Sequence, residues 1–139
     1  MELKDRILGL DVGDKRIGVA VSDPFGLFAS EVGVVTREND NRAIEEIKKY
    51  CENYKVKKIV VGLPYNMDGS MGSQAEKTLK FIQKLENLYE IVYKDERLTS
   101  FEAEEILKKE KKKYTKNKGL VDVKAACLIL QSYLGEQNG

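Results

Sequence analysis

Acidic residues stand at positions where the surrounding sequence is apolar, and they are the first candidates for chemistry. Asp11 lies inside an apolar, strand-like run, and Asp122 lies near the start of the last helix-periodic segment. Asp95 and Glu96 end another apolar segment, where their opposite strand parity lets only one of them face a given site. An unpaired charge is costly to remove from water. Each carboxylate therefore needs a donor, an open strand end or a metal ion.

The composition narrows the chemistry that these carboxylates could perform. The 139 residues include no histidine and only two cysteines, which excludes Ser-His-Asp and Cys-His nucleophile systems and argues against a zinc site. Clustered carboxylates raise one another's pKa, and a divalent cation relieves that repulsion. All-oxygen sites suit Mg²⁺ or Mn²⁺. Two such ions about 3.5–4 Å apart can activate a water and stabilise the leaving oxygen of a phosphodiester.

Each acid also has a structural interpretation that involves no metal. Asp11 could accept N–H groups of the turn that follows it, and Asp122 could be a helix N-cap. Glu96 could pair with Arg97 or Lys94. The hypothesis of a metal site depends on all three acids meeting at the ends of neighbouring elements.

The elements that must position these acids follow from hydrophobic periodicity and turn residues. Strands are predicted over 6–12, 16–22, 27–36, 57–64 and 89–95. Helices are predicted around the periodic residues Ile44–Tyr54, over 72–87, from Thr99 to Lys109, and over 120–133. Capping boxes are predicted at Ser73 with Glu76 and at Thr99 with Glu102. Cys51 and Cys127 fall on apolar helix faces, where core packing is expected.

This order predicts an α/β fold with a mixed five-stranded sheet and helices on both faces. The first three strands form an antiparallel meander, and later parallel strands join it through helical crossovers. The first strand is expected at the centre, and the fifth is expected beside it on the parallel side. The acids of both strands and of the last helix would then converge.

Length and composition predict one soluble domain over residues 1–139. The chain is 42% hydrophobic, and 24 basic residues nearly balance 23 acidic ones. The absence of a long apolar run or a signal-peptide pattern predicts a cytoplasmic protein without a membrane partner. The net charge of +1 does not by itself predict nucleic-acid binding.

Two segments could contact phosphates. The loop over 62–72 ends a buried strand and opens a helix, so Asn66, Ser70 and Ser73 could meet a phosphate near a helix N-terminus. The GK[ST] ending of a P-loop is missing, and an ordinary turn is the alternative.

The second segment, 108–118, holds seven lysines and one glutamate and is predicted to be a mobile basic loop. It could neutralise phosphates and make affinity salt-dependent, or it could be a solvated loop without a ligand. The predicted phosphate contacts in it are Lys111, Lys112, Lys113, Lys116 and Lys118.

Four segments of the chain resemble the signature blocks of the YqgF/RuvX family: "GLDVGDKRIGVAVSD", "VVGLPYNMDGSMG", "DERLTS" and "VDVKAACLILQSYL". They occur in family order and cover nearly the whole chain. The resemblance implies an RNase H-like fold related to the RuvC Holliday-junction resolvase. It also implies that Asp11, Glu96 and Asp122 are the metal-binding catalytic acids, with Asp95 as the neighbour that could replace Glu96.

The resemblance implies a nuclease with one of two roles. One is maturation of the 5′ end of pre-16S rRNA in ribosome biogenesis, with pre-rRNA and ribosomal particles as partners. The other is resolution of branched DNA junctions, which favours a two-fold homodimer over a monomer. The sequence itself does not choose between RNA and DNA.

The hypothesis from residues and resemblance together is a two-metal phosphodiesterase. Asp11 would bridge two Mg²⁺ ions, and Glu96 and Asp122 would each complete one side. Arg16 and Arg97 would hold phosphates, and the glycines of the first two strands would let nucleic acid lie close.

The sequence is also compatible with two other classes of function. An actin-like or sugar-kinase-like ATPase begins with a similar GxDxG strand, but it needs two such domains around the nucleotide. A non-catalytic RNA-binding or ribosome-assembly factor would tolerate neutralisation of all three acids.

Overall fold

The computed structural model describes residues 2–66, 68–95 and 118–138, although the side chains of residues 118–120 are not described. Its strands are β1 (Ile7–Val12), β2 (Arg16–Ser22), β3 (Ala29–Thr36), β4 (Lys58–Leu63) and β5 (Glu90–Asp95). Its helices are α1 (Asp40–Tyr54), α2 (Ser73–Ile82) and α5 (Lys118–Asn138). The predicted helix from Thr99 to Lys109 lies outside the described residues.

The five strands form one mixed sheet in the order β3-β2-β1-β4-β5. β1 pairs antiparallel with β2 and parallel with β4, so the predicted meander and the central position of β1 are confirmed. The prediction that β5 lies beside β1 is wrong, because β4 separates them. The crossover through α1 returns the chain to the free side of β1, and the crossover through α2 then adds β5 one strand further out.

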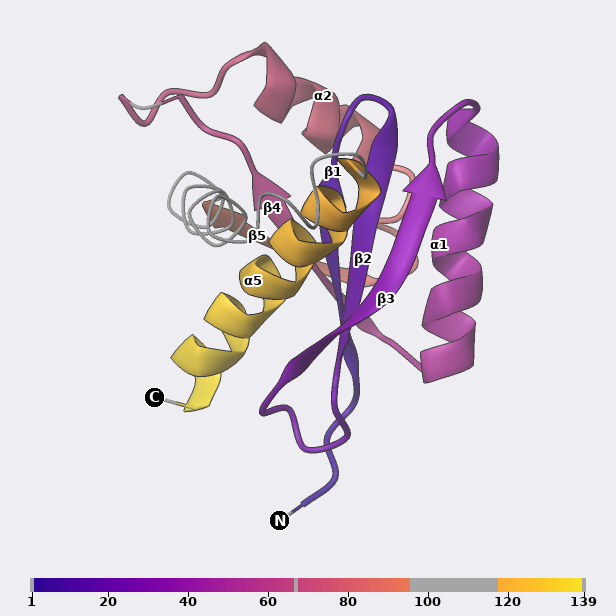
Figure 1. Cartoon of the computed structure of the whole chain (residues 1–139), viewed down its shortest axis with the longest axis vertical. Coiled ribbons are helices and arrows are strands. Elements are labelled where there is room, and N and C mark those ends of the chain that lie inside the picture. Colours follow the sequence, from indigo (N-terminus) through magenta and orange to yellow (C-terminus); the bar gives the residue numbers. More distant parts are fainter. Residues whose placement is uncertain (1, 67, 96–117, 139) are drawn as a thin grey trace.

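One face of the sheet is covered by α1 and α2, and the other by α5 (Figure 1). Leu8 and Leu10 of β1 are fully buried on the α1 side, against Ile47 and Cys51. Burial raises the pKa of the Cys51 thiol to about 11, so it stays protonated and serves as an apolar core residue, as predicted.

The α5 face has a separate apolar cluster. Ala20 of β2 and Val60 of β4 pack there against Ala126, Ile129 and Leu130 of α5. The small side chain of Ala126 lets the helix axis lie close to the strands, as the sequence predicts. Cys127 is half-buried beside this cluster rather than inside it.

Two helix starts differ from those predicted. α2 begins at Ser73, but its N-cap is Gly72 and no side chain caps it, so the predicted capping box of Ser73 is wrong. α2 ends at Ile82, and the chain continues to residue 88 in successive tight turns that keep Leu85 buried. α5 begins at Lys118, which places Asp122 inside the helix and excludes it as an N-cap.

None of the helices in the described part of the chain is long and apolar enough to span a bilayer.

Candidate active site

Asp11 lies on the central strand and faces α5. Alternate residues of a strand share a face, and a Cβ at Gly9, two residues earlier, would lie 2.8 Å from the Cβ of Leu130 in α5. Leu10 and Val12 face the opposite side, toward α1. Alternation therefore keeps Asp11 out of the apolar core on the α1 side. Asp11 is half-buried near the end of β1, on the α5 side.

The backbone of Asp122 lies directly over the strand next to Asp11. Gly18 of β2 is the cross-strand partner of Asp11. A Cβ at Gly18 would overlap the carbonyl oxygen of Asp122 and lie 2.8 Å from the backbone nitrogen of Val123. The structure thus brings Asp11 and Asp122 together on one face.

This contact overturns one expectation for the glycines of β1 and β2. Gly9 and Gly18 do not leave the strands bare for nucleic acid, because α5 fills the space above both of them. Their role is to let the helix that carries Asp122 approach the centre of the sheet.

Arg16 joins the same group of residues. Its Nε atom donates a hydrogen bond of 2.9 Å to Oδ2 of Asp122, and 34% of the Arg16 side chain and 20% of the Asp122 side chain are exposed. Burial raises the pKa of the Asp122 carboxyl above its ordinary value, while the hydrogen bond and charge of Arg16 lower it. Asp122 is thus a half-buried carboxylate held against a cation.

The end of β5 is separated from this site by β4. The register pairs Gly62 of β4 with Lys94 of β5, and Val60 places Gly62 on the α5 face. Gly62 therefore puts no side chain between β1 and β5 on that face.

Strand alternation decides which face of the sheet Asp95 occupies. Ile91 and Tyr93 pack on the α1 side, so Asp95 shares that face, opposite to Asp11. Lys94 lies on the other face, where it forms an ion pair with Glu136 of α5. Glu96 lies outside the described residues.

Arg37 supports the turn that follows Asp11, a role that the sequence did not predict. Its Nη1 atom donates 2.9 Å to the carbonyl oxygen of Gly13, and its Nε atom pairs with Asp40 at 2.9 Å. The guanidinium also lies over the ring of Phe81, 4.5 Å from its centroid. The position of Arg37 between a strand and a helix cap could suggest a local ion pair, but no sequence signal identifies the carbonyl that it reaches.

The loop after β4 lies at the same end of the sheet as Asp11. Gln74 in the first turn of α2 donates to Asp14 of the β1–β2 turn at 3.4 Å, which ties the loop to that end. Within the loop, Asn66 donates to Ser70 Oγ at 3.0 Å, and Ser70 donates to Asp68 at 2.6 Å. The hydroxyl of Ser70 is thus engaged inside the loop.

The other predicted phosphate contacts are only partly described. Ser73 is exposed in the first turn of α2. Arg97, Lys111, Lys112, Lys113 and Lys116 lie outside the described residues, and of Lys118 only the backbone is described, at the start of α5.

The donor set that is described fits a hard divalent cation in type. Asp11 and Asp122 supply carboxylate oxygens, and the glycines beside them leave the acids close to one another. No group of three acidic or cysteine side chains within the described ranges is arranged as a metal site. A cation held by these two acids would need further oxygen ligands, which water, the substrate or residues outside those ranges could supply.

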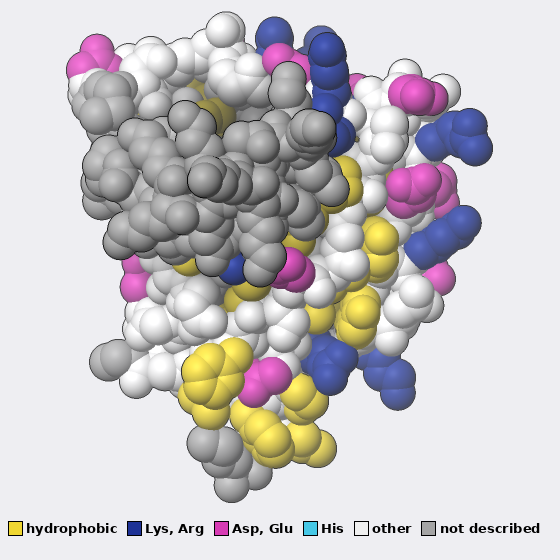
Figure 2. Space-filling view, in the orientation of Figure 1, with side chains coloured by type: hydrophobic (Ala, Val, Ile, Leu, Met, Phe, Trp, Pro, Cys, Tyr) yellow, Lys and Arg dark blue, Asp and Glu magenta, His cyan; other side chains and the backbone are white. Residues whose placement is uncertain are grey.

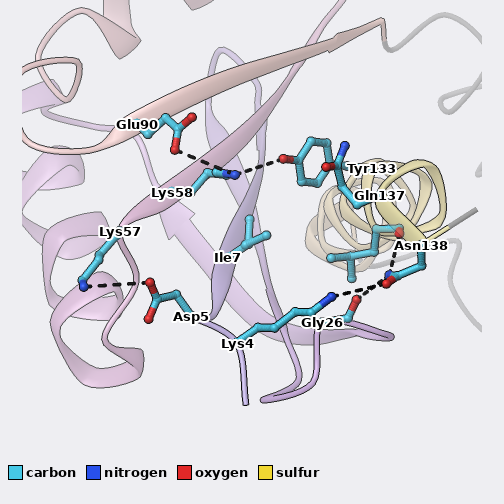
Figure 3. Close-up of a pocket in the computed structure, with 11 residues that line it drawn as sticks. Lys4, Asp5, Ile7, Gly26, Lys57, Lys58, Glu90, Tyr133, Gln137 and Asn138 are labelled. Atoms are coloured by element: carbon cyan, nitrogen blue, oxygen red, sulfur yellow. Dashed lines mark hydrogen bonds and ion pairs between the residues drawn. The ribbon is translucent and has the colours of Figure 1, made fainter. Parts of the chain in front are cut away.

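A hollow of about 410 Å³ lies far from Asp11, between the start of β1 and the end of α5 (Figure 3). Lys58 pairs there with Glu90 at 3.8 Å and donates to Tyr133 at 3.2 Å, and Lys57 pairs with Asp5. Figure 2 shows exposed hydrophobic side chains at that end of the molecule. The exposed residues Leu3 and Phe25 are the chain neighbours of Lys4 and Gly26, which line the hollow. None of the predicted site residues that the structure describes lines this hollow.

Solved structures share this arrangement of sheet and helices. The Thermus thermophilus RuvC structure with a Holliday junction matches with a TM-score of 0.58 and 14% identity, over 96% of both chains. The fowlpox virus Holliday junction resolvase matches with a TM-score of 0.60 and 14% identity, over 94% of this chain and 99% of that one. These likenesses show the fold: this is an α/β protein of the RNase H-like class found in RuvC-type resolvases, as predicted.

Sequence comparison defines the family within that class. A family model described as "RuvX: Holliday junction resolvase" matches residues 5–136. A Clostridium kluyveri protein named "Putative pre-16S rRNA nuclease" is 47% identical over 131 residues, which cover 93% of this chain and 96% of that protein. A Halothermothrix orenii protein of the same name is 46% identical over 135 residues, which cover 96% of both. The chain belongs to the RuvX family, which confirms the family resemblance and supports the predicted nuclease function.

Proposed function

We propose that this protein is a metal-dependent nuclease that processes the 5′ end of pre-16S rRNA, with residues 1–139 forming one nuclease domain. The observation that carries the proposal is the placement of Asp122 of α5 beside Asp11 of β1 on one face of the sheet, in a chain that belongs to the RuvX family. The names of its relatives supply the substrate.

Asp11, Asp122 and Glu96 would hold the cation, Mg²⁺ or Mn²⁺. Asp11 and Asp122 share the α5 face, and because Asp95 lies on the opposite face, the proposal takes Glu96 as the third ligand. Bound there, divalent ions activate a water and stabilise the leaving oxygen of a phosphodiester. In this proposal Asp95 has no ligand role.

The remaining residues of the site would bind and orient the nucleic acid. Arg37 fixes the turn after Asp11, so the strand end that carries the carboxylate is held in place. The loop after β4 and the N-terminus of α2 stand at the same end, where a backbone phosphate would meet helix N–H groups. Arg97 and the lysines of 108–118 would add positive charge along the strand.

The test is a cleavage assay with Mg²⁺ or Mn²⁺ on two substrates, an RNA with the pre-16S 5′ leader and a four-way DNA junction. Wild type should cut the RNA, and Asp11→Asn should fold normally but lose at least about 10³ in rate, since it removes a metal-binding charge. Asp95→Asn is the matched control and should retain activity.

Other outcomes decide between the remaining classes. Paired symmetric cuts in the junction alone would assign the activity that the family description names, a Holliday junction resolvase. An active Asp11→Asn enzyme would exclude the mechanism. Full function in cells after neutralisation of all three acids would show a non-catalytic binding factor.

A further inference from the structure

Arg16 and Asp122 form an ion pair within the candidate site. Arg16 begins β2 and Asp122 lies in the second turn of α5, 106 residues later in the chain. The contact joins the Nε atom of Arg16 to Oδ2 of Asp122 at 2.9 Å. The Arg16 guanidinium is therefore hydrogen-bonded to the carboxylate that would bind a metal ion in the proposed function.

The pair is not needed to attach α5 to the sheet. Ala126, Ile129 and Leu130 bury the apolar side of the helix against the strands. Two further ion pairs tie the same helix to the two edge strands, Lys124 to Glu31 of β3 and Lys94 to Glu136. The direct effect of Arg16 is on the Asp122 carboxylate, which is largely removed from water and is stabilised by a cation beside it.

The geometry of the pair allows exchange. The contact uses Nε and one carboxylate oxygen, rather than the two parallel hydrogen bonds of a bidentate arginine–carboxylate pair. One third of the Arg16 side chain is exposed, so it can turn toward water or an anion at the open end of the sheet. A divalent cation and a guanidinium compete for Asp122 because both are attracted to the same negative charge.

We propose that Arg16 is the internal counter-ion of Asp122 while no metal is bound, and that it releases this carboxylate when a divalent cation binds. This inference rests on the proposed function, since it takes Asp122 as a metal ligand. Once released, the guanidinium is available for a backbone phosphate of the substrate. Arg16 then weakens cation binding by the substrate-free protein and couples metal occupancy to phosphate binding.

The first experiment measures Mn²⁺ affinity of the full-length, substrate-free protein by electron paramagnetic resonance. Arg16→Met and Arg16→Gln should each bind Mn²⁺ about tenfold more tightly than wild type, because neither variant has a guanidinium charge that competes with the metal for Asp122. Lys124→Met breaks an ion pair of the same helix two residues away and should leave the affinity unchanged. Asp122→Asn reports how much of the binding depends on Asp122.

The second experiment is a double-mutant cycle of Arg16→Met and Asp122→Asn, measured by urea unfolding with EDTA and again with saturating Mn²⁺. The two substitutions should be coupled in EDTA, and the coupling should fall to near zero in Mn²⁺. If Arg16→Met folds poorly, Arg16→Gln replaces it in the cycle, because glutamine keeps a hydrogen-bond donor at this position.

The outcomes separate this inference from the function on which it rests. Unchanged or weaker Mn²⁺ binding by both Arg16 variants, or coupling that persists in Mn²⁺, would overturn the exchange and leave the metal site intact. Mn²⁺ binding by wild type that is indifferent to Asp122→Asn would instead overturn the assignment of Asp122 as a ligand, and the exchange with it.

Discussion

At the scale of single residues, Gly18 determines how closely α5 approaches the centre of the sheet. The space that its side chain would fill is occupied by the backbone of Asp122 and Val123. A backbone segment inside a helix cannot move aside as the end of a flexible side chain can. The distance between Asp11 and Asp122 therefore depends on a glycine that carries no chemistry of its own.

Replacing Gly18 with alanine should displace α5 and destabilise the protein. The added methyl group overlaps the Asp122 carbonyl, and we expect a loss of about 3 kcal/mol or more in the free energy of unfolding. Mn²⁺ affinity should fall as well, because the two acids are forced apart. Urea unfolding followed by circular dichroism measures the first effect, and electron paramagnetic resonance measures the second.

Gly135 provides the control for this substitution. It is an exposed residue of α5, and a Cβ there would meet nothing within 4 Å. Gly135→Ala should therefore raise the free energy of unfolding by about 0.5–1 kcal/mol, the usual gain for alanine over glycine in a helix. If Gly18→Ala were as well tolerated as Gly135→Ala, the close approach of α5 to β2 would be contradicted.

At the scale of elements, local sequence patterns predicted the strands and helices whose structure depends mainly on their own residues. Period-2 alternation and turn residues predicted β1 and β2 to within one residue, and the antiparallel meander followed from them. The burial of Cys51 followed from helical spacing in the same way. These features depend on contacts between neighbours in the chain.

The features that were missed depend on how distant segments pack. Placing β5 beside β1 failed because strand order is set by two crossovers, not by any strand's own residues. The pairing of Asp122 with Arg16 could not be predicted, since it required knowing that α5 begins at Lys118 and lies over Gly18. Gly72 replaced the predicted cap of α2 because the loop after β4 ends with an extended residue there.

The start of α1 provides a test of electrostatics at this scale. The side chain of Asn39 caps the helix, and Asp40 in the first turn accepts a hydrogen bond from Arg37. That hydrogen bond, together with the charge of Arg37, lowers the pKa of Asp40 below its ordinary value of 3.8. A carboxyl whose pKa is lower in the folded state stabilises the protein above its unfolded pKa and loses that effect as the pH falls through the folded value.

Asp40→Asn should therefore cost stability only where Asp40 is ionised. We expect a loss of about 0.5 kcal/mol near neutral pH, a small value because Asp40 is nearly half exposed. The difference from wild type should disappear below the lowered pKa, and urea unfolding at pH values of about 7, 5 and 3 measures this trend. In an Arg37→Met background the pH dependence should shrink, and an unchanged pH dependence there would contradict the assignment to Arg37.

At the scale of the whole molecule, charge is balanced in number but uneven along the chain. Lysine and arginine exceed aspartate and glutamate by one, yet seven lysines stand among the eleven residues 108–118. A balanced total gives little general attraction to nucleic acid. Binding to a phosphate backbone must then depend on where the lysines are rather than on how many there are.

This dependence can be measured as a salt slope. Each phosphate contact that is lost should reduce the slope of log K against log salt by about 0.7 for single-stranded RNA. Replacing Lys111, Lys112, Lys113, Lys116 and Lys118 with glutamine should flatten the slope, measured by fluorescence anisotropy in an Asp11→Asn background that prevents cleavage.

The control variant replaces five lysines of α1, its cap and α2 with glutamine: Lys48, Lys49, Lys55, Lys77 and Lys80. Each variant loses five positive charges, so both have a net charge of −4 instead of +1. Equal slopes for the two would show that total charge, and not the 108–118 segment, governs binding, whereas a flattened slope in the first variant alone would place the nucleic acid along that segment.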